Sequence, residues 1–204
     1  IGMGAKLTLT NSYGDDVTSG TQTFTGDGIL NFIYCDGYFA DVTQIQIATT
    51  TVANGRSLYF DSGTLGKVVS GEGKIWVRQG KSITTDANNL QVADVYNNGT
   101  LIIQPTTENE DKINSLKPNI TSVTGYYGEQ GSLELHGFNE AHGTINQTTI
   151  TIAQDSTLDA YKTVTATQAT DGILNKGAAF FFVGDLQGDV KNVVPAAPDD
   201  ATFP

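Results

Sequence analysis

The sequence predicts an all-β protein, and three features of its 204 residues support this fold class. Threonine occurs 28 times, and its branched Cβ favours extended backbone. The 23 glycines, with many asparagines, supply the tight turns that short strands need. Charged residues make up only 16% of the chain, so glutamate, lysine and arginine, which favour helices, are scarce. We therefore expect many short strands and at most one short helix.

Three regions are expected along the chain. Residues 1–26 are expected to form an N-terminal arm, in which Lys6-Leu7-Thr8-Leu9-Thr10 alternates as a strand does. Residues 27–194 are expected to form a single β domain. Residues 195–204 are rich in proline and aspartate, which predicts an extended tail.

Strand signals follow one another through the β domain at intervals of roughly 8–15 residues. The segments with the strongest β propensity are 38–52, 58–60, 75–77, 90–96, 101–103, 120–124, 133–135, 149–153 and 178–183. One helix is predicted near residues 108–116, because Thr107 and Glu110 fit a capping box and Pro118 would end the helix. A charged loop is the alternative there.

Two architectures fit this pattern. A β-sandwich or jelly roll is preferred, because the strand spacing and the apolar positions Val42, Ile45 and Ile47 suit a sheet with one buried face. The alternative is a β-solenoid. Segments 73–83 and 97–103 resemble rungs of bacterial autotransporter passenger domains, a resemblance that covers about residues 55–105 and implies stacked rungs around an apolar column. No repeat of fixed length is kept, which favours the sandwich.

A five-residue segment occurs twice. Asp27-Gly28-Ile29-Leu30-Asn31 recurs unchanged at residues 171–175. A duplication would place equivalent strands at both ends of the domain, side by side. The alternative is that the same turn-then-strand chemistry arose independently, with Asp-Gly as the turn.

The net charge of −11 argues against a nucleic-acid partner, which requires clustered lysine and arginine. Five of the eleven basic residues fall between positions 56 and 81, and a solvated face explains them better than a docking patch. No apolar run is long enough for a membrane span. The single cysteine, Cys35, follows Phe32-Ile33-Tyr34 and is expected to be a buried small hydrophobe.

No arrangement of residues indicates catalysis, so we expect a protein that is not an enzyme and carries no cofactor. The two histidines, His136 and His142, lie two residues after Glu134 and Glu140, and each pair would share one face of a strand. Imidazole and carboxylate groups suit zinc or a similar ion, although an exposed polar face near a hairpin is the simpler interpretation. Calcium is a second candidate ion. Its candidate ligands are loop carboxylates, which ordinary surface turns also explain: Asp36, Asp41, Asp185 and Asp189.

The sequence contains candidate glycan-binding aromatic residues and candidate glycosylation sites. Aromatic side chains that could bind a glycan are Trp76, Tyr126 and Tyr127, although half-buried aromatics at strand ends are the simpler interpretation. Sequons for N-glycosylation begin at Asn98, Asn119 and Asn146, and they matter only in a host that uses them. In such a host, all three are expected at strand edges, where a glycan would fit.

These observations predict a structural subunit of an extracellular, cell-surface or virion-surface assembly, of filament, pilus-like or capsid-decoration type. Its partner would be a second copy of the chain, joined by strand addition through residues 6–10. The start at Ile1 rather than Met is taken as a processed N-terminus. The alternative function is a carbohydrate-binding module or adhesin domain, with glycans as partners.

Overall fold

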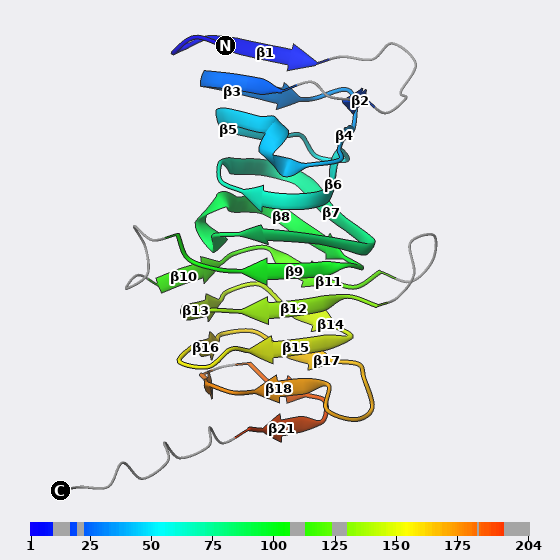
Figure 1. The fold of residues 1–204 in the computed structure, drawn as a ribbon, viewed down its shortest axis with the longest axis vertical. Coiled ribbons are helices and arrows are strands. Elements are labelled where there is room, and N and C mark those ends of the chain that lie inside the picture. The colour runs from blue at the N-terminus through cyan, green and yellow to red at the C-terminus, as the bar shows by residue number, and fades with distance from the viewer. Residues whose placement is uncertain (10–16, 20–22, 107–112, 124–129, 183, 194–204) are drawn as a thin grey trace, which may run out of the picture.

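The computed structural model of the chain describes residues 1–9, 17–19, 23–106, 113–123, 130–182 and 184–193. It is a β-solenoid, in which parallel strands stack along one axis from β1 at the N-terminal end to β21 at the other end (Figure 1). The all-β prediction is confirmed, the solenoid alternative is correct, and the preferred sandwich is wrong. The strands are β1 (Lys6–Leu9), β2 (Val17–Ser19), β3 (Phe24–Phe32), β4 (Gly37–Phe39), β5 (Ile45–Val52), β6 (Ser57–Leu65), β7 (Val68–Thr85), β8 (Leu90–Asn97), β9 (Thr100–Ile103), β10 (Ile113–Leu116), β11 (Asn119–Thr121), β12 (Ser132–Leu135), β13 (Phe138–Ala141), β14 (Ile145–Gln147), β15 (Thr149–Ile152), β16 (Thr157–Ala160), β17 (Val164–Ala166), β18 (Ile173–Asn175), β19 (Ala178–Phe181), β20 (Leu186–Gln187) and β21 (Val190–Asn192).

Each turn of the solenoid has three sides. In one such turn the chain forms β13, β14 and β15, and these strands pair in parallel with β16, β17 and β18 of the next turn. We call the sides formed by β13, β14 and β15 the first, second and third side. Longer strands occur in the N-terminal half, where β7 bends and pairs with β5, β6, β8 and β9.

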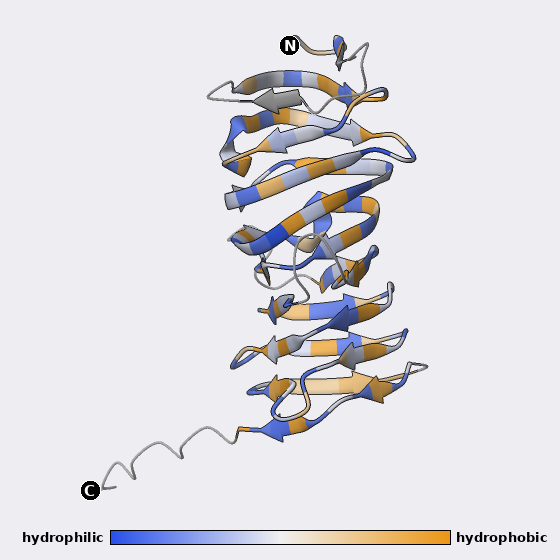
Figure 2. Cartoon of the chain, turned by 90° about the vertical axis from the view of Figure 1, so that its right-hand side faces the viewer, coloured by the Kyte–Doolittle hydropathy of each residue, from blue (hydrophilic) through white to orange (hydrophobic). Residues whose placement is uncertain are grey.

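The core consists of columns of inward-facing apolar side chains at the same level of successive strands. Along most strands, inward-facing apolar residues alternate with outward-facing polar ones, and Figure 2 shows the resulting alternation of colours. The column on the second side is Leu58, Ile75, Val95, Ile120, Ile145, Val164 and Leu186. The column on the third side is Ile83, Leu101, Leu133, Ile150, Ile173 and Val190. Burying one such side chain stabilises the fold by about 1.5–3 kcal/mol.

The columns stay in register although the repeat length varies. Ile75 and Val95 are 20 residues apart, whereas Val95, Ile120 and Ile145 follow at intervals of 25. The extra residues fall between strands, for example between the end of β9 at Ile103 and the start of β10 at Ile113. Only the strands must stack, so a search for a fixed sequence period misses this solenoid.

The prediction of a helix near 108–116 is wrong for residues 113–116, which form β10; residues 107–112 lie outside the described part of the chain. Asn114 and Leu116 face inward and stack on Asn139 and Ala141. Among the described residues, helical structure is limited to two 3₁₀ helices, η1 (Val42–Gln44) and η2 (Ala87–Asn89).

The expected N-terminal arm contributes the first strands of the solenoid. β1 pairs with β3, and β3 crosses the boundary that the sequence placed at residue 26. The α-ammonium group of Ile1 donates a hydrogen bond to the Thr25 carbonyl at 2.8 Å. The expected tail, 195–204, lies outside the described residues.

The repeated segment does not form equivalent strands. Leu30 faces the core, whereas its counterpart Leu174 faces outward, because Ile173 takes the inward position. The two copies also lie near opposite ends of the solenoid, in β3 and β18 (Figure 1). The prediction that they lie side by side is therefore wrong.

Cys35 is buried, as predicted from its apolar neighbours. Its burial raises the pKa of the thiol, and the nearby charge of Asp36 raises it further. In the part of the chain that the structure describes, no helix has the length and apolar character needed to cross a membrane.

Candidate functional site

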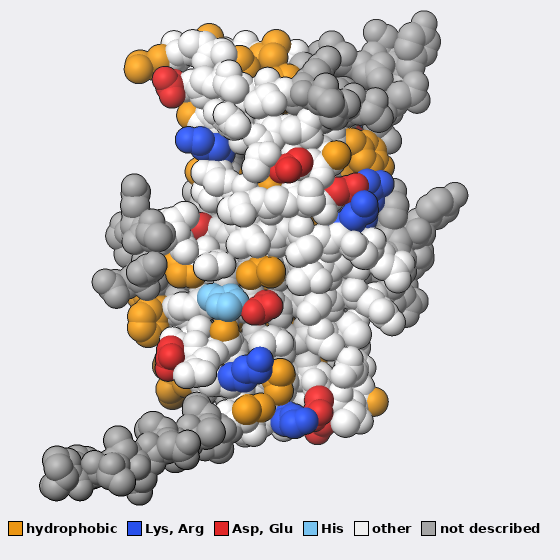
Figure 3. Space-filling view, in the orientation of Figure 1, with side chains coloured by type: hydrophobic (Ala, Val, Ile, Leu, Met, Phe, Trp, Pro, Cys, Tyr) orange, Lys and Arg blue, Asp and Glu red, His pale blue; other side chains and the backbone are white. Residues whose placement is uncertain are grey.

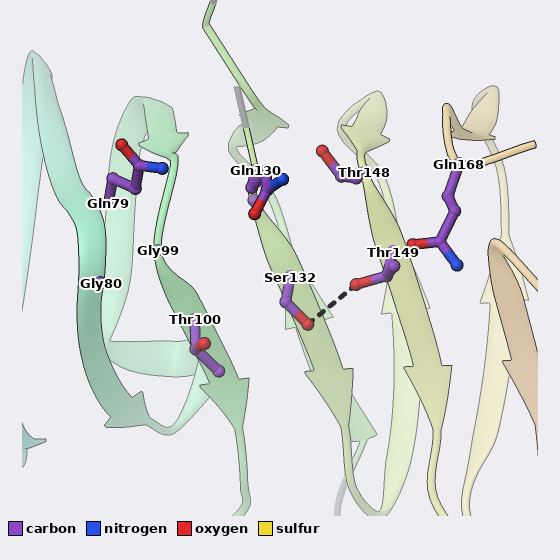
Figure 4. Close-up of a pocket in the computed structure, with 10 residues that line it drawn as sticks. Gln79, Gly80, Gly99, Thr100, Gln130, Ser132, Thr148, Thr149 and Gln168 are labelled. Carbon is purple, nitrogen blue, oxygen red and sulfur yellow. Dashed lines mark hydrogen bonds between the residues drawn. The ribbon is translucent and has the colours of Figure 1, made fainter. Parts of the chain in front are cut away.

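A polar groove runs along the solenoid axis at the corner where the second side meets the third. Its volume is about 430 Å³, and it crosses β7, β9, β12 and β15 and reaches the segment before β18 (Figure 4). We call it the axial groove. The residues that line it are Gln79, Gly80, Gly99, Thr100, Gln130, Gly131, Ser132, Thr148, Thr149 and Gln168. None of these residues carries a charge.

Strand register brings hydroxyl groups into line along one wall. Ser132 pairs with Thr100 on one side and with Thr149 on the other. The Thr149 hydroxyl donates a hydrogen bond to the Ser132 hydroxyl at 3.0 Å, drawn in Figure 4. The same position is occupied by Ser82 and Ser62 in the preceding strands, so the column of hydroxyls extends beyond the groove.

Buried amides fix the corner beneath the groove. Asn97 donates hydrogen bonds to Gln147 Oε1 at 2.6 Å and to the Ser132 carbonyl at 2.9 Å. A Cβ at position 131 would overlap the backbone carbonyl oxygen of Asn97, so glycine is required there. At Gly80 a Cβ would meet nothing within 4 Å, but the φ of +71° at this position would strain any other residue placed there. The groove is thus a fixed hollow on a rigid corner.

A column of aromatic side chains lies on the outer face of the second side. The rings of Tyr38 and Tyr59 stack at 4.3 Å, and Tyr59 stacks on Trp76 at 5.9 Å. Trp76 meets Tyr96 edge to face at 4.6 Å. All four side chains are half-buried. Because the stacked faces cover one another, this column stabilises the solenoid and offers mainly ring edges to solvent.

Basic side chains cover further aromatic faces. The Arg78 guanidinium lies 5.2 Å from the centre of the Tyr38 ring, and the Lys74 ammonium lies 4.8 Å from that of Tyr96. Arg78 also forms a bidentate ion pair with Asp61, with N–O distances of 2.8 and 2.5 Å. The structure thus places Trp76 within a packed column, and the other two predicted glycan-binding residues, Tyr126 and Tyr127, lie outside the described residues.

The candidate calcium ligands accept hydrogen bonds from other groups of the protein. Asp36 accepts one from the Ser57 backbone at 2.9 Å, and Asp189 accepts one from the Asp171 backbone at 2.8 Å. Asp185 accepts one from the Gln187 side chain at 3.3 Å. Within the described ranges, no three acidic, histidine or cysteine side chains are grouped to hold a metal ion.

Asp41 caps the 3₁₀ helix η1. The hydroxyl and the backbone N–H of Thr43 donate hydrogen bonds to its carboxylate at 2.7 and 2.8 Å. The hydroxyl bond is the main cause that lowers the pKa of Asp41, and the backbone bond adds to it. This geometry assigns Asp41 a capping role.

The glutamate–histidine pairs share strand faces as predicted. His136 lies 2.7 Å from Glu134, and His142 lies 3.1 Å from Glu140. His142 also stacks on Tyr161 at a centroid distance of 4.9 Å. Neither pair gains a third metal ligand from the described part of the structure.

The three sequons differ in accessibility. Asn98 is buried, and its amide exchanges two hydrogen bonds of 2.8 Å with the Val123 backbone, so this side chain is not placed to carry a glycan. Asn119 is exposed and bonds Asp94, while Asn146 is half-buried on the outer face of β14. The expectation that a glycan would fit at all three positions is wrong for Asn98.

Sequence reasoning missed the axial groove. Glutamine, threonine and glycine are common throughout the chain, and no short motif marks the lining residues. Their alignment depends on stacking residues that lie 17 or more positions apart, such as Ser132 and Thr149. Comparison of the chain with protein-family models, curated proteins and solved structures found no match.

Proposed function

We propose that the protein is a non-enzymatic, rod-shaped subunit of an extracellular or particle-surface assembly, in which copies join end to end by strand addition. The observation that carries this proposal is the state of the two solenoid ends. The side chains that continue the core columns there are exposed to solvent, and the strands there pair on one edge only.

At the N-terminal end, Leu7 stacks on the fully buried Leu30, yet 37% of Leu7 is exposed. At the C-terminal end, Val190 stacks on the buried Ile173, yet 38% of Val190 is exposed. Among the described strands, β1 pairs with β3 alone and β21 with β18 alone. Unpaired backbone edges with exposed apolar side chains accept further strands.

The polarity of the solenoid favours contact between opposite ends. All pairs among the described strands, such as β1–β3 and β18–β21, are parallel, so only a copy arriving with the same direction of winding continues the pattern. Around the axis, β1, β2 and the start of β3 make the first turn, whereas β19, β20 and β21 make the last (Figure 1). Head-to-tail contact of this kind is heterologous and produces open chains.

The surface between the ends suits a particle exterior. Figure 3 shows a face that is mostly white, the colour of the backbone and of uncharged polar side chains, with acidic and basic residues scattered over it. The net charge of −11 would keep the sides of such rods apart. Both features support association through the ends.

Two end variants and one matched control test the proposal. Leu7→Lys and Val190→Lys each place a charge at one end, and Ile113→Lys places it on an outer face in mid-solenoid, where the side chain is 55% exposed. We expect the unchanged protein and Ile113→Lys to form chains that lengthen with concentration, measured by light scattering and electron microscopy. Each end variant alone should be a monomer with an unchanged circular dichroism spectrum.

Mixing the two end variants gives the sharpest result. Each variant retains one intact end, so an equimolar mixture should form a one-to-one dimer and nothing longer. A wild-type protein that stays monomeric at every concentration would refute the proposal, as would a mixture of end variants that fails to dimerise.

A further inference from the structure

We propose that the axial groove binds a neutral polysaccharide chain lying along the solenoid axis. This site is separate from the solenoid ends and from the aromatic column of the second side. Three features of the groove support this ligand: the composition of its lining, the repetition of that lining along the axis, and the length of the groove.

The lining matches a ligand that carries many hydroxyl groups. The side chains of Gln79, Gln130 and Gln168 are exposed at the groove, as Figure 4 shows. Each amide and each threonine or serine hydroxyl both donates and accepts hydrogen bonds, as sugar hydroxyls do. In the described part of the chain, no large apolar side chain lines the groove, so a flat apolar ligand would gain little from these residues.

The uncharged lining favours a neutral glycan over an anionic one. The chain as a whole is strongly acidic, yet none of the described residues that line the groove is acidic or basic. An anionic polysaccharide would be repelled by the surrounding protein without any lysine or arginine in the groove to hold it. The complementary ligand is therefore a neutral sugar polymer.

Equivalent hydrogen-bonding positions recur along the groove at regular intervals, as the sugar units of a polymer do. Thr100, Ser132 and Thr149 occupy the same position in adjacent strands, and such strands lie about 4.8 Å apart. From the level of Gln79 to that of Gln168, the groove spans roughly 19 Å at this spacing. A chain of several sugar units laid along the axis would meet an equivalent set of donors and acceptors at each level.

The groove is also preorganised. The buried amide pair of Asn97 and Gln147 holds the corner, and parallel pairing fixes the strand starts that carry the hydroxyls. The backbone therefore needs little ordering on binding, which favours affinity for a ligand that offers only hydrogen bonds.

The test uses titration calorimetry of the full chain with cellohexaose, maltohexaose and mannohexaose, and with hexagalacturonate as the anionic comparison. We expect at least one neutral hexamer to bind, with an affinity that does not change between low and high salt. The double variant Gln130→Ala with Gln168→Ala should lower that affinity by roughly tenfold, because two hydrogen-bonding amides are lost.

Control variants make the test specific. Gln154→Ala removes an exposed glutamine from the turn before β16 and should leave binding unchanged. Val190→Lys should bind as the wild type does, which separates this site from end-to-end assembly. Ser132→Tyr should fill the groove and abolish binding, with thermal melts to confirm folding. If Ser132→Tyr does not fold, the Gln130/Gln168 double variant decides the question.

Three results would overturn the inference. One is that none of the neutral hexamers binds. Another is binding of hexagalacturonate alone, with loss at high salt. The third is neutral-hexamer binding that survives the Gln130/Gln168 double variant but is lost in Trp76→Ala, which would move the site to the aromatic column.

Discussion

Replacing Ile120 with alanine should destabilise the protein far more than the same replacement at Ile113. Both residues belong to one turn of the solenoid, in β11 and β10. Ile120 faces inward between Val95 and Ile145 and is fully buried, whereas Ile113 faces outward and is 55% exposed. The pair thus isolates the contribution of the core column from that of β propensity.

The magnitude follows from the structure. The substitution removes the equivalent of three carbon atoms, and each buried methylene contributes about 0.8 kcal/mol, so transfer alone amounts to about 2.4 kcal/mol. The neighbours above and below belong to paired strands and cannot collapse into the space, which adds a cavity contribution. We expect a loss of about 3–4 kcal/mol for Ile120→Ala and under about 1 kcal/mol for Ile113→Ala.

Urea unfolding monitored by circular dichroism measures both values, because the midpoint shifts with stability at constant slope. The column architecture would be refuted if Ile113→Ala destabilised the protein as much as Ile120→Ala. It would also be refuted if Ile120→Ala cost less than about 1 kcal/mol, since a side chain in the middle of a packed column cannot be removed so cheaply.

Three further predictions concern buried or capped polar groups. Asn97→Ala should cost about 1–3 kcal/mol in urea unfolding, because it leaves the buried Gln147 oxygen without its donor; a smaller loss would contradict that role. Thr43→Val should raise the pKa of Asp41 toward its ordinary value in an NMR titration. In the wild type the folded-state pKa of Asp41 is depressed, so its stabilisation is present above the unfolded pKa and is lost as pH falls through the folded pKa; an unchanged pKa in the variant would argue against the cap. The Cys35 thiol should react with a thiol reagent at neutral pH only as fast as the protein unfolds, because it is buried and its pKa is raised; rapid labelling of the native protein would show otherwise.

Local sequence features located much of the secondary structure. The segments at Ile75–Val77, Leu101–Ile103 and Leu133–Leu135 were predicted as strands and lie within β7, β9 and β12. The alternation of β-branched and polar residues indicates which face of a strand is buried, and a few neighbouring positions are enough to show it.

Local signals failed where a distant partner decided the structure. A capping-box match at Thr107 and Glu110 predicted a helix that would include residues 113–116, yet Asn114 and Leu116 face the core two positions apart, as in a strand. The parallel partner β13 provides the backbone hydrogen bonds for this segment, and no local pattern shows that partner. Tertiary pairing therefore overrode the helix signal.

The sequence by itself determined that the chain is all-β, which positions are apolar, and that Cys35 is buried, because these properties follow from side-chain chemistry and short-range spacing. Only the tertiary structure decided that the strands stack as a solenoid and that Thr100, Ser132 and Thr149 line one groove. The physical reason is that parallel strands are joined by connections of variable length, so residues that become neighbours in space are separated by intervals that the sequence does not keep constant.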